Sequence, residues 1–348
     1  MLNWFRMRRD RRFEDGCKAF ERGRFAQAAL AWRSAAIEGD VKSALRLADM
    51  FANGVGVLQS LADAKHWYGV AAEGGIARAQ VRLAELYLSG ASARSVSQMS
   101  SAIEALCPNG VALIRNDTEA RRWALAAAEQ GDVSGQALIG YLLASGLGGK
   151  PDYAAAAHWY RLASEGGDAR AQLGIGTLLA GRFLGEPNYE EARVWFKKAA
   201  DQGNGAAMYY IGALVQRGYG GPADMVTATA YFRRSAEAGC VEGQRCLGKA
   251  FLAGEGVPRD VAAAESWLRK AARAGDVDAM ASLGDLFAGE AATIAEAMEW
   301  YRLAAERGHK AAQIMLRRID ALEDRKSVAP TGGLDCPEVP RPELLVRI

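Results

Sequence analysis

The side chains that could act as nucleophiles, general bases or metal ligands are few and scattered. The chain of 348 residues has three histidines: His66, His158 and His309. The first two each lie directly before a tryptophan in matching contexts, which a repeat explains better than catalysis does. A catalytic nucleophile needs a positioned base, and no spacing here supplies that pair. We therefore predict no catalytic residue, no metal site and no cofactor.

The cysteines follow no regular spacing. They are Cys17, Cys107, Cys240, Cys246 and Cys336. An odd number without a repeat favours free thiols over a disulfide framework. Cys240 and Cys246 are close enough in sequence to approach each other, but we expect both to be free thiols.

Tryptophan marks an internal repeat. Five positions, each 36 residues from the next, carry an indole or a phenol: Trp123, Trp159, Trp195, Tyr231 and Trp267. Trp32, Trp67 and Trp300 extend the series toward both ends. Self-similarity at a fixed period of this size is typical of stacked repeat architectures.

The repeated unit has the pattern of a helical hairpin. Ala192, Trp195, Phe196 and Ala199 recur at the spacing of one apolar helix face, and Gly203 ends that helix. A second helix with the same kind of face follows, over residues 206–217. The Gly-x-Gly turns of the chain therefore join two helices. A dinucleotide-binding fingerprint would need a strand before the glycines.

Small residues indicate how the hairpins pack. A glycine recurs within the helical segment that follows each helix of the tryptophan series, at Gly140, Gly176, Gly212, Gly248 and Gly284. Glycine within a helix costs about 1 kcal/mol relative to alanine. Close approach of a neighbouring helix would offset that cost. We expect the repeat tryptophan to cover this small-residue surface, and Trp195→Ala to cost roughly 3 to 5 kcal/mol.

The repeat resembles the Sel1-like repeat family, which is related to the tetratricopeptide repeats. The resemblance rests on a Gly-x-Gly-Val turn, an aspartate and an Ala-x-x-Trp-Tyr-x-x-Ala-Ala segment, seen at 53–72 and, with Leu268 for the tyrosine, at 254–272. Junction glutamines also match: Gln80, Gln136, Gln172, Gln244 and Gln313. The resemblance covers about residues 13–320. It implies an all-α, right-handed α-solenoid of about eight helix-turn-helix repeats.

The resemblance also implies function. Members of the family organise protein complexes and relay signals, including envelope regulation in bacteria. Cysteine-rich relatives carry one disulfide per repeat, but the matching positions here hold apolar residues such as Ala272 and Met280. Hydrolase activity has been attached to those relatives, and we keep it as a remote alternative.

Three segments divide the chain. Residues 1–12 form a basic and aromatic amino-terminal segment, residues 13–325 form the solenoid, and residues 326–348 form a Pro-rich tail that we expect to be disordered. The wide gap between Trp67 and Trp123 places an insertion at about 91–117. Its second half is apolar, so we expect it to pack on the solenoid or on a partner, or to form a loop with a small cluster of its own. The apolar end of the tail, 343–348, would bind another protein or its own groove.

Composition favours a cytoplasmic protein with no nucleic-acid partner. Half of the residues are apolar and the formal net charge is only +2. No apolar run is long enough to span a membrane, and the arginines of the first fifteen residues precede no apolar stretch of a signal peptide. We expect a monomer, although the sequence does not fix the oligomeric state.

We predict that partners bind in the concave groove of the solenoid, on the helix of each hairpin that carries the junction glutamine. Counted from that glutamine, this is the first helix of the hairpin, and the tryptophan-bearing helix is the second. A protein or peptide would fill it with side chains, while arginines pair with its carboxylates. The repeat spacing predicts ten groove residues: Arg78, Arg82, Tyr141, Arg170, Leu173, Thr177, Tyr209, Tyr210, Arg245 and Lys249. A non-catalytic scaffold or adaptor is thus the predicted function.

The amino-terminal segment supports an alternative. It interleaves large apolar side chains with arginines, namely Trp4, Phe5, Arg6, Arg8 and Arg9. Such a segment suits the interface of an anionic membrane. The alternative function is therefore a peripheral membrane organiser at the inner face of the membrane.

Overall fold

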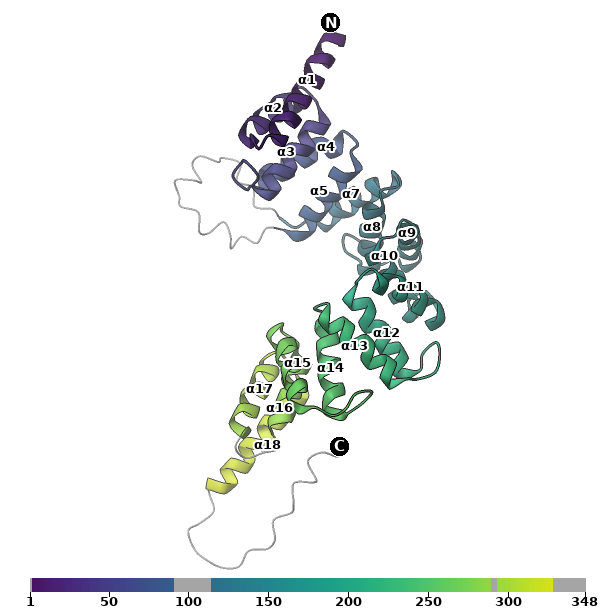
Figure 1. The fold of residues 1–348 in the computed structure, drawn as a ribbon, viewed down its shortest axis with the longest axis vertical. Coiled ribbons are helices and arrows are strands. Elements are labelled where there is room, and N and C mark those ends of the chain that lie inside the picture. The colour runs from purple at the N-terminus through teal and green to yellow at the C-terminus, as the bar shows by residue number, and fades with distance from the viewer. Residues whose placement is uncertain (1, 91–113, 289–292, 328–348) are drawn as a thin grey trace, which may run out of the picture. The chain divides into compact units, whose positions relative to one another are not determined.

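The chain folds into α-helical hairpins, which divide between two compact units. The computed structural model describes residues 2–90, 114–288 and 293–327, with side chains described from 10 to 319 within these ranges. Unit 1 is Met1–Pro187 and unit 2 is Asn188–Ile348. Apart from one 3-10 turn, the described elements are α-helices, and no strand occurs in these ranges. The predicted all-α repeat architecture is confirmed (Figure 1).

Unit 1 contains the helices α1 to α10. Their bounds are α1 Leu2–Glu21, α2 Phe25–Ile37, α3 Val41–Asn53, α4 Leu61–Glu73, α5 Ala77–Ser89, α7 Asp117–Glu129, α8 Val133–Ser145, α9 Tyr153–Glu165 and α10 Ala169–Ala180, followed by the 3-10 turn η1 Arg182–Leu184. Each helix packs against the next, and α8 also packs against both α5 and α10. The first helices of successive hairpins therefore form one continuous face, which we call the inner face.

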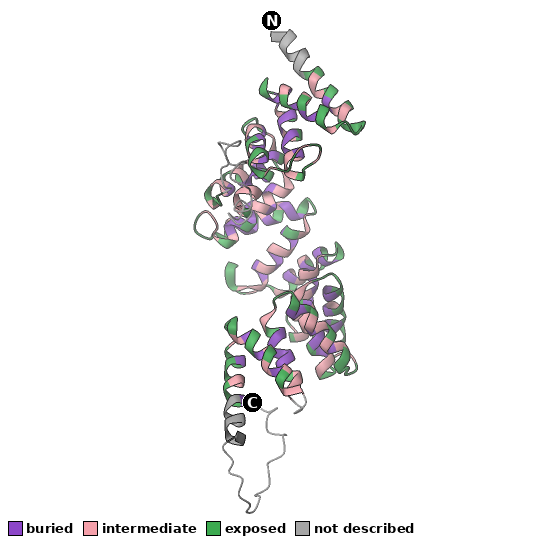
Figure 2. Ribbon diagram, turned by 90° about the vertical axis from the view of Figure 1, so that its left-hand side faces the viewer, coloured by how far each residue is buried: buried purple, intermediate pink, exposed green. Residues whose placement is uncertain are grey.

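Unit 2 repeats the plan. Its helices are α11 Tyr189–Asp201, α12 Gly205–Arg217, α13 Met225–Glu237, α14 Val241–Ala253, α15 Val261–Arg273, α16 Val277–Phe287, α17 Ile294–Glu306 and α18 Lys310–Ser327. Here α14 packs against both α12 and α16. In both units the buried residues lie on the facing sides of the helices (Figure 2).

Local signals in the sequence set the helix ends. Asp132 caps α8 by accepting a hydrogen bond from the backbone N–H of Gly135 at 2.8 Å, and Asn204 caps α12 in the same way. Gly203 has a φ of +88°, the left-handed conformation predicted for it. The junction glutamine has a structural role, because the buried Nε2 of Gln80 donates to the carbonyl of Ala72 at 3.1 Å.

The prediction that tryptophan covers the mid-helix glycines is wrong by one residue. A β-carbon added at Gly212 would lie 2.6 Å from Cε1 of Phe232, the residue after Tyr231. At Gly284 it would lie 2.5 Å from Tyr301, the residue after Trp300. Phe196 is fully buried, whereas Trp195 is half-buried beside Glu191 and Lys198. The residue after the tryptophan is therefore the one that fills the hairpin.

Trp32 does not occupy the repeat position of the other tryptophans, but the position that follows it. Trp32 lies 36 residues before Tyr68, not before Trp67, and it is 2% exposed. Its indole lies against Gly16 of α1, and its Nε1 donates to the carbonyl of Phe13 at 3.2 Å. Trp32 therefore covers a glycine of its hairpin, as Phe232 and Tyr301 do in theirs.

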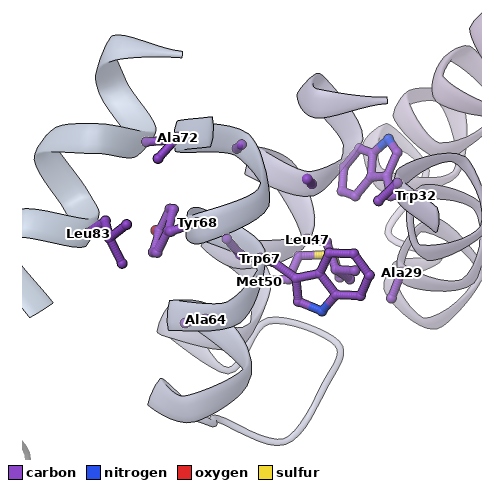
Figure 3. Packing of buried hydrophobic residues seen from close by; sticks show 14 of the residues in the cluster. Ala29, Trp32, Leu47, Met50, Ala64, Trp67, Tyr68, Ala72 and Leu83 are labelled. Atoms are coloured by element: carbon purple, nitrogen blue, oxygen red, sulfur yellow. The ribbon is translucent and has the colours of Figure 1, made fainter. Parts of the chain in front are cut away.

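The repeat tryptophan contacts the preceding hairpin. In Figure 3, Trp67 lies on the side of Met50 and Ala29, whereas Tyr68 lies on the side of Leu83 of α5. The two adjacent aromatic residues thus face opposite neighbours. Together they join three successive hairpins into one apolar cluster.

Several predictions fall partly or wholly outside the described residues. The insertion at 91–113, the tail at 328–348 and the side chains of Trp4, Phe5, Arg6, Arg8 and Arg9 are among them. The helix α1 runs without a break across residue 12, the predicted end of the first segment. The terminal helix α18 continues to Ser327, two residues past the predicted end of the solenoid at 325.

Candidate partner-binding groove

A pocket of about 420 Å³ opens between α8, α9 and α10 of unit 1. Four predicted groove residues line it: Tyr141, Arg170, Leu173 and Thr177. The remaining lining is almost entirely apolar and consists of Ala137, Leu138, Ala144, Tyr160, Gly174 and Leu178. Its volume lies within the range of small-molecule and side-chain sites, roughly 300 to 1,000 Å³. The pocket lies on the inner face, where α8 and α10 pack together.

Tyr160 of α9 lies between the two inner helices. Its side chain is only 6% exposed, and burial raises the pKa of its hydroxyl well above the usual range. A β-carbon at Gly140 of α8 would lie 2.7 Å from Cδ1 of the ring, and one at Gly174 of α10 would lie 2.5 Å from Cζ. The ring is therefore seated between two glycines, and neither position accepts a larger residue without a shift of the ring.

The hydroxyl of Tyr160 differs from its counterparts in other hairpins. Tyr68 donates to Asp49 at 2.7 Å, and Tyr301 donates to Asp285 at 2.7 Å. Tyr141 stands at the position of these aspartates in the Tyr160 hairpin. Within the part of the chain that the structure describes, no atom forms a hydrogen bond with the Tyr160 hydroxyl. The hydroxyl oxygen is not sealed inside the protein, because the Tyr160 side chain lines the pocket and the oxygen opens onto it.

The rim of the pocket carries charges that compensate each other. An Nη atom of Arg170 lies 3.1 Å from a carboxylate oxygen of Asp168, which also caps α10. The Thr177 hydroxyl donates to the carbonyl of Leu173 at 2.9 Å. Tyr141 is 51% exposed and offers its ring to solvent. The rim thus presents mainly apolar and aromatic surface to a ligand.

The other predicted arginines of unit 1 are also paired within the chain. Arg78 lies 3.2 Å from Asp49, and Arg82 lies 2.9 Å from Glu85. Both side chains are more than half exposed, so these pairs contribute little to stability. A partner carboxylate would have to compete with these intramolecular carboxylates.

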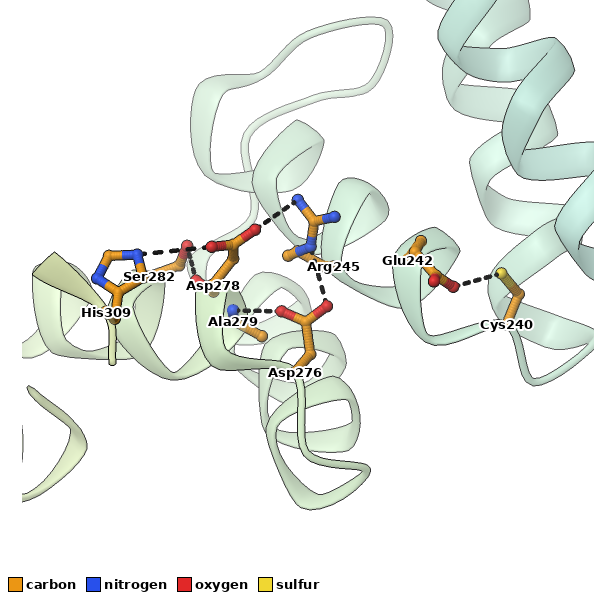
Figure 4. A network of polar contacts seen from close by, with 8 residues as sticks. All are labelled: Cys240, Glu242, Arg245, Asp276, Asp278, Ala279, Ser282 and His309. Carbon is orange, nitrogen blue, oxygen red and sulfur yellow. Dashed lines mark hydrogen bonds and ion pairs between the residues drawn. The ribbon is translucent and has the colours of Figure 1, made fainter. Parts of the chain in front are cut away.

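The predicted residues of unit 2 are engaged in internal contacts. The ring of Tyr210 stacks on Phe196 with centroids 5.1 Å apart, and Tyr209 lies beside Tyr210. Arg245 lies 3.0 Å from Asp276 and 3.6 Å from Asp278, and so links α14 to α16 (Figure 4). Lys249 is exposed on α14. Arg245 therefore acts first as a brace between successive hairpins.

The described histidines and cysteines, the other side chains that could take part in catalysis or bind a metal, make contacts that belong to the fold or lie exposed beside the repeat tryptophans. His309 accepts a hydrogen bond from the N–H of Ala312 and so caps α18, while His66 and His158 are exposed beside their tryptophans. Cys240 and Cys246 are free thiols, as predicted, and burial raises the pKa of each. Among the described residues, no group of histidine, cysteine or acidic side chains could hold a metal ion. No described helix could span a membrane.

Comparison with protein families settles the kind of repeat. The Sel1 repeat model matches eight segments: 41–76, 77–104, 109–132, 133–168, 169–204, 205–240, 241–276 and 277–309. Together these segments cover most of the chain. The chain belongs to the Sel1 repeat family. Sel1 repeats typically form scaffolds for protein–protein interaction.

Solved structures of Sel1 proteins agree with this fold. A protein of uropathogenic Escherichia coli, c5321, described as a protective antigen with an SLR fold, is 30% identical with a TM-score of 0.70, over 94% of this chain and 68% of that one. A Sel1 repeat protein from Oxalobacter formigenes is 24% identical with a TM-score of 0.63, over 75% of this chain and 96% of that one. No curated protein matches the sequence.

The Sel1 repeat frame shows why the pocket lies where it does. Gly174 is the sixth residue of its repeat, and the sixth residues of the other helical copies are Arg46, Arg82, Leu138, Tyr210, Cys246 and Ser282. At the equivalent position in the next repeat, the ring of Tyr210 stacks on Phe196, the counterpart of Tyr160. Gly174 has no side chain that could cover Tyr160 in the same way. The pocket is therefore the consequence of one glycine in one Sel1 repeat.

Sequence reasoning missed the two residues that define this pocket, Tyr160 and Gly174. Tyr160 was hidden in the core pattern of the second helix, and Gly174 was one of two glycines in α10. The usable signal was a glycine at a repeat position that holds a larger side chain in every other copy.

Proposed function

We propose that this chain is a non-catalytic scaffold that binds a peptide segment of a partner protein across α8 and α10. The proposal takes its support from the 420 Å³ pocket, which has an apolar lining and lies on the inner face of unit 1. An extended or helical peptide suits such a face, because one side chain fills the pocket while the backbone follows the helices. Tyr141 and Leu173 are the expected anchors, since aromatic and apolar contacts near the centre of an interface contribute most to affinity.

A bacterial regulatory or envelope-related pathway is part of the proposal. Its support is the 30% identical E. coli relative, which is described as a protective antigen. The cytoplasmic location and the membrane contact through residues 4–9 remain predictions from the sequence.

The proposal is tested by panning a library of random dodecapeptides on the intact chain. Selected peptides are then measured by isothermal titration calorimetry against the wild type and Leu173→Glu. We expect the charge at the pocket wall to weaken binding at least about tenfold, because it places an unpaired carboxylate among apolar side chains.

Ile37→Glu is the matched control. Ile37 is an apolar residue of the same unit, 71% exposed on α2, away from the residues that line the pocket. It should leave peptide affinity unchanged. Peptides that bind the wild type and Leu173→Glu equally would place the binding surface elsewhere and refute the groove assignment.

A further inference from the structure

We infer that the pocket between α8 and α10 selects a tyrosine side chain of the partner peptide, with the phenol oxygen accepting a hydrogen bond from Tyr160. This inference rests on the proposed function and specifies its ligand. It starts from a hydroxyl that opens onto the pocket and has no partner among the described residues. Tyr160 as a whole is only 6% exposed, and none of its interactions is a hydrogen bond of the hydroxyl.

A ligand that fills the pocket must offer an acceptor to the Tyr160 hydroxyl. The hydroxyl opens onto the pocket, and a ligand that covered it without an acceptor would leave a buried donor unsatisfied. In the hairpins of Tyr68 and Tyr301 an aspartate of the first helix provides that acceptor. In the Tyr160 hairpin the equivalent residue is Tyr141, and the hydroxyl opens onto the pocket instead. The vacant acceptor position is therefore available to a ligand.

The charges near the pocket favour a neutral acceptor. Arg170 lines the pocket, but its charge is already compensated by Asp168 at 3.1 Å. The rest of the lining is almost entirely apolar. A ligand carboxylate at the Tyr160 hydroxyl would therefore lose its hydration without gaining an unpaired cation. The acceptor at the base of the pocket should therefore be uncharged.

The apolar walls determine what carries that acceptor. Leu138, Ala144, Leu173 and Leu178 surround the space above Tyr160, and Tyr141 provides an aromatic edge. An aromatic ring satisfies these walls by burial and by ring contacts with Tyr141 and Tyr160. Tyrosine combines such a ring with one neutral oxygen at its tip, whereas phenylalanine lacks the oxygen and glutamate lacks the ring.

The test uses three blocked amino acids as probes against the full-length chain. N-acetyl-tyrosinamide has the ring and the oxygen, N-acetyl-phenylalaninamide has the ring alone, and N-acetyl-4-carboxyphenylalaninamide places an anion at the tip. Affinities come from chemical-shift titration of the leucine and alanine methyl groups that line the pocket. We expect the tyrosine probe to bind about two- to tenfold more tightly than the phenylalanine probe, the range given by one net hydrogen bond. The anionic probe should bind most weakly.

Two variants separate recognition from stability. Tyr160→Phe removes a hydroxyl with no partner in the described chain, so the protein should keep its thermal stability and lose the preference for the tyrosine probe. Tyr301→Phe removes a hydroxyl bonded to Asp285 in unit 2, so it should lower stability and keep the preference.

Each other outcome overturns the inference in a different way. Equal affinities for the tyrosine and phenylalanine probes, or a preference that survives in Tyr160→Phe, would refute the role of the hydroxyl. Tightest binding of the anionic probe would refute the neutral acceptor. If no probe shifts the pocket methyls while library peptides still depend on Leu173, the tyrosine inference fails and the proposed scaffold function stands. If the probes bind as expected and the library gives no Leu173-dependent peptide, the proposed function fails instead.

Discussion

At the scale of single residues, the two adjacent aromatic positions of each second helix have different tasks. The tryptophan lies half-buried against the preceding hairpin, whereas the following residue fills the space beside the mid-helix glycine. Both positions recur every 36 residues, and both lie on the apolar stripe of the helix. Periodicity alone therefore could not assign the glycine contact to the second of them.

The contact between Gly212 and Phe232 gives a stability prediction. A β-carbon at Gly212 would lie 2.6 Å from the Phe232 ring and 3.2 Å from the carbonyl oxygen of Ala228. We expect Gly212→Leu to lower the free energy of unfolding by about 1 to 3 kcal/mol or more through overpacking. Urea denaturation followed by circular dichroism measures the loss. Gly69→Ala is the control, because Gly69 lies in α4 with nothing within 4 Å, and alanine there should add up to about 1 kcal/mol. Similar losses at both sites would contradict the close-approach explanation.

At the scale of helices, the capping side chain of one helix can connect it to the preceding hairpin. Asp276 accepts a hydrogen bond from the N–H of Ala279 at 2.7 Å, and it also pairs with Arg245 of α14 at 3.0 Å. Both charged side chains are less than one-fifth exposed. One carboxylate therefore caps α16 and holds α14 beside it.

The double role of Asp276 predicts a larger effect than capping alone. Asp260 caps α15 in the same way but has no such arginine, and Asp260→Ala should cost about 0.5 to 2 kcal/mol. We expect Asp276→Ala to cost roughly 1 to 2 kcal/mol more, because the half-buried guanidinium of Arg245 loses its closest partner. Thermal unfolding of both variants, and of each combined with Arg245→Met, measures the coupling. Equal costs at the two caps would mean that the ion pair contributes nothing.

At the scale of the whole molecule, the main contacts of each described hairpin are with its neighbours in the same unit. The stability of such an array is approximately a sum of hairpin terms and neighbour terms. A defect should therefore loosen the nearby helices first and leave distant ones protected.

Phe232→Ala tests this expectation. The ring is 2% exposed and packs between α12 and α13, so its removal should cost roughly 3 to 5 kcal/mol. In native-state hydrogen exchange the amides of α12, α13 and α14 should exchange faster, whereas those of α3 and α4 in unit 1 should keep their wild-type rates. Uniform acceleration along the chain would show that the protein unfolds as one cooperative body.

The sequence by itself determined the architecture. Hydrophobic periodicity and junction glycines act over a few residues, so they predicted the hairpins, their 36-residue period and the inner helices that carry Tyr141, Arg170, Leu173 and Thr177. The family resemblance followed from the same local pattern, and the Sel1 match confirmed it.

Only the tertiary structure decided which inner surface is open. The pocket depends on the absence of a side chain at Gly174 above Tyr160, and these residues belong to different helices. Likewise, the sequence did not predict that Arg78 pairs with Asp49, or that Arg245 pairs with Asp276, across hairpins. Whether a polar or apolar group is free to bind depends on what packs against it from elsewhere in the chain, and a repeat pattern records only the residue's own position.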